Sequence, residues 1–145
     1  MFKKGDGMTK KIAFSMIISR GVIVAGENDT VTYVSKLMNE HDIGAVVILK
    51  GEKIVGIVSE RDVVRRVVAV GLSPTSTKVA DVMTKDVVTA KYESGLDNIY
   101  RTLCSVKFRH LPILKDNKLI GIASQRDILY GLKMRDELRK RGSRK

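Results

Sequence analysis

A serine followed three residues later by an aspartate occurs twice in the sequence, each time between a run typical of a strand and a run typical of a helix. Ser59 and Asp62 form the first pair, and Ser124 and Asp127 form the second. At the start of a helix, such a serine accepts a hydrogen bond from a backbone N–H, and the acid three residues later accepts one in return. The pattern therefore predicts two capping boxes, each worth about 1 kcal/mol and requiring no ligand.

The same geometry could also bind a phosphate and a sugar. A helix N-terminus offers backbone N–H groups and the positive end of the helix dipole, which favour a phosphate near the serine hydroxyl. The carboxylate one turn into the helix can accept hydrogen bonds from two adjacent ribose hydroxyls. Gly56 and Gly121, three residues before each serine, would let another group approach the strand closely. Arg61 and Arg126 could neutralise a phosphate at the helix start or lie in solvent.

Both motifs belong to an internal repeat with an offset of 65 residues. Residues 48–62 read ILKGEKIVGIVSERD and residues 113–127 read ILKDNKLIGIASQRD, with nine of fifteen positions identical. The same register extends back with weaker identity to Phe14 and Val79. Each copy is therefore about fifty residues long, the size of one supersecondary unit that cannot bury its apolar face alone.

The hydrophobic pattern inside each copy predicts the order β-α-β-β-α. Strands are expected at Gly21–Ala25, Ala45–Lys50, Lys53–Val58, Val87–Ala90, Leu111–Lys115 and Lys118–Ala123. Helices are expected over residues 30–41, Glu60–Val70 (with Gly71 as the C-cap), 96–107 and Gln125 to about Arg141. Hairpin turns are expected at Gly51-Glu52 and Asp116-Asn117. The expected fold is α/β (α+β in some schemes), with the two copies packed sheet against sheet about a pseudo-twofold axis.

The repeat also predicts the organisation of the chain. We expect a basic N-terminal tail over residues 1–13, the first copy over 14–71, a linker over 72–78, the second copy over 79–132 and a basic helical extension over 133–145. The native start could be Met1 or Met8, since either methionine lies before the repeat.

Most of the positive charge lies at the two ends of the chain. The formal net charge is +11, of which residues 1–13 contribute +3 and residues 133–145 contribute +5, leaving +3 for the body. Basic ends attract nucleic acids by counterion release, but they also keep proteins soluble without any partner. Because the last helix becomes mostly charged after Leu132, we expect its end to be a solvated extension, with a partner-binding role as the alternative.

The remaining composition argues against several classes of protein. No apolar run approaches the length of a membrane span, and the first residues do not resemble a secretory signal. Cys104 is the only cysteine, and neither it nor His41 has a catalytic or metal-ligating partner at a suitable spacing. We therefore expect a cytoplasmic protein that has no membrane association, metal site or enzymatic activity.

The pattern Gly-hydrophobic-x-Ser-x-x-Asp after a hairpin, present twice in a β-α-β-β-α repeat, resembles the CBS (cystathionine β-synthase) domain family. Val79–Thr89 (VADVMTKDVVT) and Arg109–Ile113 (RHLPI) are also similar to segments of that family. The resemblance covers about residues 14–132 and implies a stand-alone tandem pair, or Bateman module. It further implies that AMP, ADP, ATP or S-adenosylmethionine binds in two clefts between the copies, and that the pairs form flat homodimers.

The resemblance assigns roles to individual residues. It implies that Asp62 and Asp127 contact ribose and that Ser59 and Ser124 contact phosphate. The candidate binding residues are Ile23, Ala45, Val46, Ser59, Arg61 and Asp62 in the first copy, and Thr84, Val88, His110, Leu111, Pro112, Ser124, Arg126 and Asp127 in the second.

The two copies differ just before the hairpin. Gly44-Ala45-Val46-Val47 stands where the second copy has Arg109-His110-Leu111-Pro112, so the two clefts are not expected to be equivalent. Gly44 and Ala45 could leave room for an adenine ring or simply ease packing. His110 could touch a phosphate or have only a structural role.

Three hypotheses about function follow. The first is a regulatory sensor of adenosine compounds, with no required cofactor, whose output passes through an effector protein or a change of oligomer. The second is a nucleic-acid-associated protein that uses its basic ends. The third is a structural dimer whose motifs only cap helices.

Overall fold

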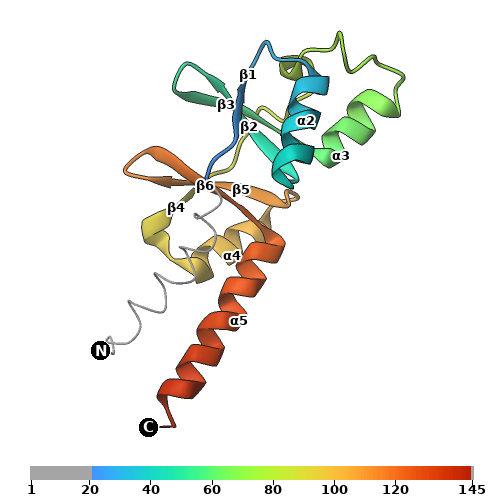
Figure 1. Cartoon of the computed structure of the whole chain (residues 1–145). Coiled ribbons are helices and arrows are strands. Elements are labelled where there is room, and N and C mark those ends of the chain that lie inside the picture. Colours follow the sequence, from blue (N-terminus) through green and yellow to red (C-terminus); the bar gives the residue numbers. More distant parts are fainter. Residues whose placement is uncertain (1–20, 145) are drawn as a thin grey trace. The chain divides into compact units, whose positions relative to one another are not determined.

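The computed structural model describes residues 21–144, which form two compact units. The N-terminal unit spans Ile23–Val87, and the C-terminal unit comprises residues 21–22 and 88–144 of the described residues. Each unit has a three-stranded sheet with helices, in the order β-α-β-β-α (Figure 1). The predicted repeat and fold class are therefore confirmed. The predicted N-terminal tail, both candidate start methionines and residues 14–20 lie outside the described residues.

In the N-terminal unit, β2 (Ala45–Lys50) is the central strand. It pairs in parallel with β1 (Val24–Gly26) and antiparallel with β3 (Lys53–Ser59). Helix α2 (Val31–His41) begins after the N-cap Thr30, whose side chain accepts a hydrogen bond from the backbone N–H of Tyr33 at 3.1 Å. The apolar faces of the sheet and helices form one core, which consists of Ala25, Val31, Val34, Met38, Val46, Ile48, Val58, Val67, Val79, Val82 and Met83.

The C-terminal unit repeats this arrangement with β4 (Ala90–Lys91), β5 (His110–Lys115) and β6 (Lys118–Ser124). A short 3-10 helix at Tyr92–Ser94 leads into α4 (Leu96–Ser105), and α5 (Gln125–Gly142) follows β6 directly. The core consists of Ala90, Leu96, Ile99, Leu103, Leu111, Ile113, Ala123 and Ile128.

The two hairpins match in detail. The register shifts between Ile48 and Leu49 in one hairpin and between Ile113 and Leu114 in the other, which are equivalent positions under the offset of 65. Both predicted turns are confirmed, and Asp116 and Asn117 have φ of +50° and +60°. Because the irregularity is repeated at the same place, both copies present their strand ends in the same register.

The prediction of one α-helix over Glu60–Val70 is wrong in its second half. Helix α3 covers only Glu60–Val63, and Val64–Val68 is π-helical, with the N–H of Ala69 donating to the carbonyl of Val64 at 2.8 Å. This stretch is rich in valine, and β-branched side chains crowd an α-helical turn. The wider turn accommodates them while Val67 stays fully buried.

The first strand of each copy is also shorter than predicted. The expected strand Gly21–Ala25 is β1 at Val24–Gly26, because only these three residues are in register with β2. The expected strand Val87–Ala90 is β4 at Ala90–Lys91, which pairs with β5 over two positions.

The prediction that the end of the last helix is only a solvated extension is wrong at Arg135. Its side chain is 10% exposed, and its Nη1 lies 2.7 Å from Oδ2 of Asp97 on α4. Burial lowers the pKa of Arg135, but hydrogen bonds and charge from Asp97 and then Asp136 outweigh burial and leave that pKa raised. The ion pair between Arg135 and Asp97 therefore holds α5 against α4 beyond the apolar first turns of α5.

The segment that connects the two copies packs on the N-terminal unit. The N–H of Val31 donates to the carbonyl of Thr77, and the N–H of Val79 donates to the carbonyl of Asp29, both at 2.9 Å. Val79 is also fully buried in the core of this unit. The unit therefore includes residues 79–87, which the sequence repeat places at the start of the second copy.

Candidate functional site

The first Ser-x-x-Asp motif lies where β3 passes into α3, as predicted. The N–H of Ser59 donates to Oδ2 of Asp62 at 2.9 Å, and the N–H of Asp62 donates to Oγ of Ser59 at 3.2 Å. The Ser59 hydroxyl also donates to the same carboxylate oxygen at 3.0 Å. The predicted capping box is confirmed, and it fixes both side chains before any ligand is present.

The second motif repeats this geometry where β6 passes into α5. The N–H of Ser124 donates to Oδ2 of Asp127 at 3.0 Å, and the N–H of Asp127 donates to Oγ of Ser124 at 3.1 Å. The carboxylates of Asp62 and Asp127 thus occupy matching places in the two units. We refer to the Ser59–Asp62 junction as the first site and to the Ser124–Asp127 junction as the second site.

The first residue of each helix is also hydrogen-bonded to the residue that precedes the neighbouring strand. The N–H of Glu60 donates to the carbonyl of Gly44 at 3.0 Å, and the N–H of Gln125 donates to the carbonyl of Arg109 at 3.1 Å. Sequence reasoning missed this pair of bonds, because the first N–H groups of a helix have no partner within the helix and their partners elsewhere have no sequence signal. The bonds fix the start of each helix against β2 or β5.

Gly56 does allow a close approach to the strand, and the group that approaches is the side chain of Met83. A Cβ added to Gly56 would lie 2.7 Å from Cγ of Met83 and closer still to its sulfur. One residue further along each segment, Ile57 and Thr84 exchange backbone hydrogen bonds of 3.0 and 2.9 Å. The glycine therefore lets the segment that carries Thr84 lie against β3, two residues before Ser59.

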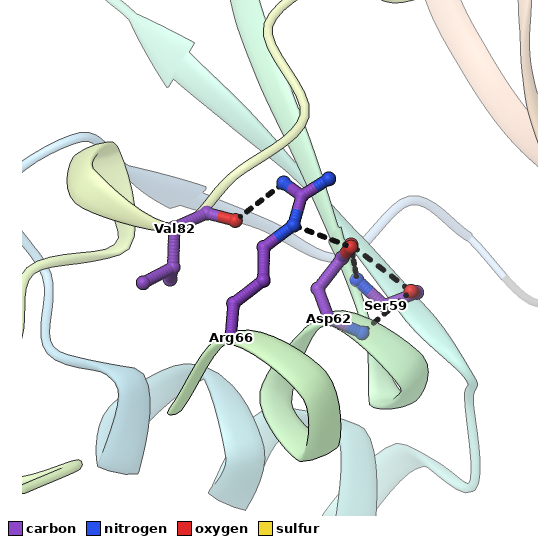
Figure 2. Close-up of polar contacts among 4 residues, drawn as sticks. All are labelled: Ser59, Asp62, Arg66 and Val82. Atoms are coloured by element: carbon purple, nitrogen blue, oxygen red, sulfur yellow. Dashed lines mark hydrogen bonds and ion pairs between the residues drawn. The ribbon is translucent and has the colours of Figure 1, made fainter. Parts of the chain in front are cut away.

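Arg66 joins this segment to the first site (Figure 2). Its Nη1 donates to the carbonyl of Val82 at 2.9 Å, and its Nε lies 3.6 Å from Oδ1 of Asp62. Sequence reasoning missed Arg66, although its spacing of four residues from Asp62 on a helix is a signal for an ion pair. The contact with Val82 has no such signal, because it joins residues 16 positions apart through a backbone carbonyl.

The structure places the remaining candidate residues in two groups. Ala45, Val46, Leu111 and Pro112 are buried, so their side chains belong to the interior of the units. The side chains that are partly or fully exposed are those of Ile23, Ser59, Arg61, Asp62, Thr84, Val88, His110, Ser124, Arg126 and Asp127.

The structure brings some of these candidates together within a unit. In the N-terminal unit, Ala45 pairs with Ser59 across the sheet, and Thr84 lies beside β3, although the repeat places Thr84 in the second copy. In the C-terminal unit, His110 pairs with Ser124 in the same way. Each serine thus has the first residue of the neighbouring strand directly opposite it.

Two absences concern only the described part of the chain. Within residues 21–144, no three His, Cys, Asp or Glu side chains gather as a metal site. In the same range, no helix combines the length and apolar character that crossing a bilayer would need.

Comparisons with known proteins find relatives that carry CBS domains. The chain is 34% identical over 120 residues to the mitochondrial CBS domain-containing protein CBSX3 of Arabidopsis thaliana, covering 78% of this chain and 58% of that protein. It is 33% identical over 122 residues to an uncharacterized protein of Methanopyrus kandleri, covering 83% and 62%. The chain thus spans about three fifths of the length of these two relatives.

A solved structure and the family profile indicate the same family. The solved structure of a protein with CBS domains from Burkholderia ambifaria superposes with a TM-score of 0.75 at 33% identity, covering 81% of this chain and 91% of that one. The CBS domain profile matches residues 14–69 and 79–133, which together exceed half of the chain. The chain therefore belongs to the CBS domain family, as a protein with two CBS domains in tandem.

Proposed function

We propose that this chain is a regulatory module that binds an adenosine compound, namely AMP, ADP, ATP or S-adenosylmethionine, at its Ser-x-x-Asp junctions. The observation that carries the proposal is the duplicated junction itself, in which a serine and an aspartate are fixed at the start of a helix in both units. Membership of a family whose members commonly bind nucleotides supports the same assignment. No cofactor beyond this ligand is required.

The carboxylate of Asp62 is suited to a ribose. Its Oδ2 already accepts two hydrogen bonds from Ser59, whereas Oδ1 has only the longer contact with Arg66. Since each carboxylate oxygen has two lone pairs, Oδ1 retains acceptor capacity for a sugar hydroxyl. The neighbouring Arg61 is exposed and could move toward a phosphate.

A regulatory output requires only differential binding. A ligand that binds one arrangement of the protein more tightly than another shifts the population toward the first arrangement. We propose that the shift is passed to an effector protein or to a second copy of the chain.

Calorimetric titration with AMP, ATP and S-adenosylmethionine tests the proposal. We expect saturable binding to the wild type, and at least a tenfold loss of affinity at the altered site in Asp62→Ala and in Asp127→Ala. A hydrogen bond to a charged group contributes about 1.5–3 kcal/mol, and a tenfold change corresponds to about 1.4 kcal/mol. Asp86→Ala, which removes an exposed carboxylate outside both junctions, should bind as the wild type does.

Two outcomes would contradict the proposal. One is no binding of any of the three compounds at millimolar concentration. The other is binding that both alanine variants retain at full affinity, which would place the ligand elsewhere. Circular dichroism should show that the variants are folded, because each aspartate also closes a capping box.

The proposed assembly is a homodimer, and exposed apolar side chains on the second helix of each unit support it. Val64 and Leu129, which are equivalent under the offset of 65, are 58% and 54% exposed. Val68, one turn after Val64, is exposed as well. Aliphatic side chains exposed at the same position of both copies are suited to contacts with a second copy.

Introducing charge at these positions should weaken self-association. We expect the double variant Val64→Glu and Leu129→Glu to sediment as a monomer in analytical ultracentrifugation at concentrations where the wild type is a dimer. Tyr33→Glu changes an exposed apolar residue on α2 and serves as the control that should stay dimeric. A double variant that stays dimeric would show that the helices bearing Val64 and Leu129 do not form the contact.

A further inference from the structure

Arg66 makes two contacts at once, which distinguishes it from the other cations on its helix. It lies against the Asp62 carboxylate of the first site and donates to the Val82 carbonyl in the segment that completes the N-terminal unit. An exposed i,i+4 ion pair alone contributes only a few tenths of a kcal/mol. The second contact matters more, because it joins the helix to a separate part of the chain.

The contact with Asp62 acts on the oxygen that remains for a ligand. Oδ2 is held by Ser59, so the guanidinium beside Oδ1 restricts how this second oxygen can turn. The separation of 3.6 Å is longer than a hydrogen bond. The charge of Arg66 therefore orients Oδ1 and leaves its lone pairs able to accept hydrogen bonds from a ligand. The Asp62 side chain remains 15% exposed.

The contact with Val82 acts on the segment that carries Thr84. Two residues after Val82, Thr84 pairs with Ile57 on β3, and between them Met83 packs over Gly56. The bond from Arg66 therefore anchors the chain just before it lies against the first site. Figure 2 shows Arg66 reaching Val82 on one side and Asp62 on the other.

The repeat position that corresponds to Arg66 in the C-terminal unit does not carry an arginine. The position equivalent to Arg66 is Gly131, which is buried on α5 and brings no side chain or charge. Gly131 therefore cannot reproduce the two contacts that Arg66 makes with Asp62 and Val82.

We propose that Arg66 is a positioning residue for ligand binding at the first site only, where it orients the Asp62 carboxylate and holds the segment containing Thr84 in place. The inference rests on the proposed function and deepens it, because it identifies a residue that sets the affinity for the adenosine compound at the first site. Arg66 acts through Asp62 and the segment rather than as a ligand-contacting group.

Single-site backgrounds test the inference with AMP as the probe. Asp127→Ala leaves the first site, and in that background Arg66→Met should weaken AMP binding by about tenfold, the equivalent of about 1.4 kcal/mol. Asp62→Ala leaves the second site, where the same change should alter the affinity by less than about twofold. Methionine suits the test, because its helix propensity is close to that of arginine.

Two further variants separate positioning from charge. Arg65→Met removes the same charge from an exposed neighbour and should leave both backgrounds unchanged. Arg66→Lys keeps the charge but lacks the planar group that reaches both partners, so it should behave like Arg66→Met. Wild-type affinity in Arg66→Lys, or an equal loss in both backgrounds, would overturn the inference.

A second measurement requires no ligand and separates this inference from the proposed function. In Arg66→Met, amide hydrogen exchange at Thr84 and Ile57 should accelerate by about tenfold, because their mutual hydrogen bonds lose the anchor at Val82. The control Arg65→Met should exchange at the wild-type rate. Unchanged exchange would overturn the positioning role even if AMP binds. Faster exchange without binding of AMP, ATP or S-adenosylmethionine would contradict the proposed function alone.

Discussion

Replacing Gly56 by alanine should lower the free energy of unfolding of the N-terminal unit by about 2 kcal/mol, within the range of about 1–3 kcal/mol for overpacking a core. The added methyl group would collide with the Cγ and sulfur of Met83, and its separation from the Cβ of Met83 would be only 3.1 Å. Because the clash involves the root of the side chain as well as its tip, Met83 must move as a whole. Urea unfolding followed by circular dichroism measures the change.

Gly26→Ala is the matched control for this prediction. Gly26 also lies in a strand of the same sheet, but a Cβ there would meet only Oδ2 of Asp29 at 3.5 Å, an ordinary contact. In a Met83→Ala background, the cost of Gly56→Ala should fall, because the two residues compete for one volume. An equal cost of Gly56→Ala with and without the Met83 side chain would show that the strand glycine is required for another reason.

Removing the Asp97 carboxylate should destabilise the C-terminal unit by about 1–2 kcal/mol. Asp97→Ala leaves the guanidinium of Arg135, with its side chain 10% exposed, without its nearest partner. The penalty stays below that of a fully buried pair, because Asp97 itself is 58% exposed and water can enter from its side. Urea unfolding gives the magnitude, and amide exchange in α4 and α5 should locate the effect there.

The expected loss of stability in Asp97→Ala comes from leaving the buried charge of Arg135 without a partner, rather than from the loss of a favourable contact. Adding Arg135→Met to Asp97→Ala should therefore restore most of the stability, because an apolar side chain of similar length fills the same space without a charge. Asp136→Ala removes the more distant carboxylate, at 3.4 Å, and should cost less than about 0.5 kcal/mol. A double variant less stable than Asp97→Ala would contradict this explanation.

The sequence was sufficient for the fold and for the two junctions because both are encoded locally. The offset of 65 residues aligns the hairpins, and the Ser-x-x-Asp spacing determines a capping box within one turn of a helix. These interactions join residues that are close in the chain, so their spacing alone predicts them.

The missed features depend on contacts between distant residues. Arg66 reaches Val82 over 16 positions, and Arg135 reaches Asp97 over 38. Neither separation along the sequence corresponds to a helix or strand period that would predict a contact. A charged side chain near a chain end is ordinarily expected to be solvated. Gly56 is an intermediate case, since its type predicted a close approach but could not show that Met83 makes it.

The packing of residues 72–87 on the N-terminal unit also determines where the protein can be divided. A fragment cut at the repeat boundary after Lys78 would lack the core residues Val79, Val82 and Met83, and would remove the side chain that packs over Gly56. The appropriate end for an isolated first half is Val87. The sequence repeat and the compact unit therefore have different boundaries, because residues 79–87 belong to the second copy in the repeat and to the N-terminal unit in space. An isolated unit should be expressed with the boundaries of the compact unit.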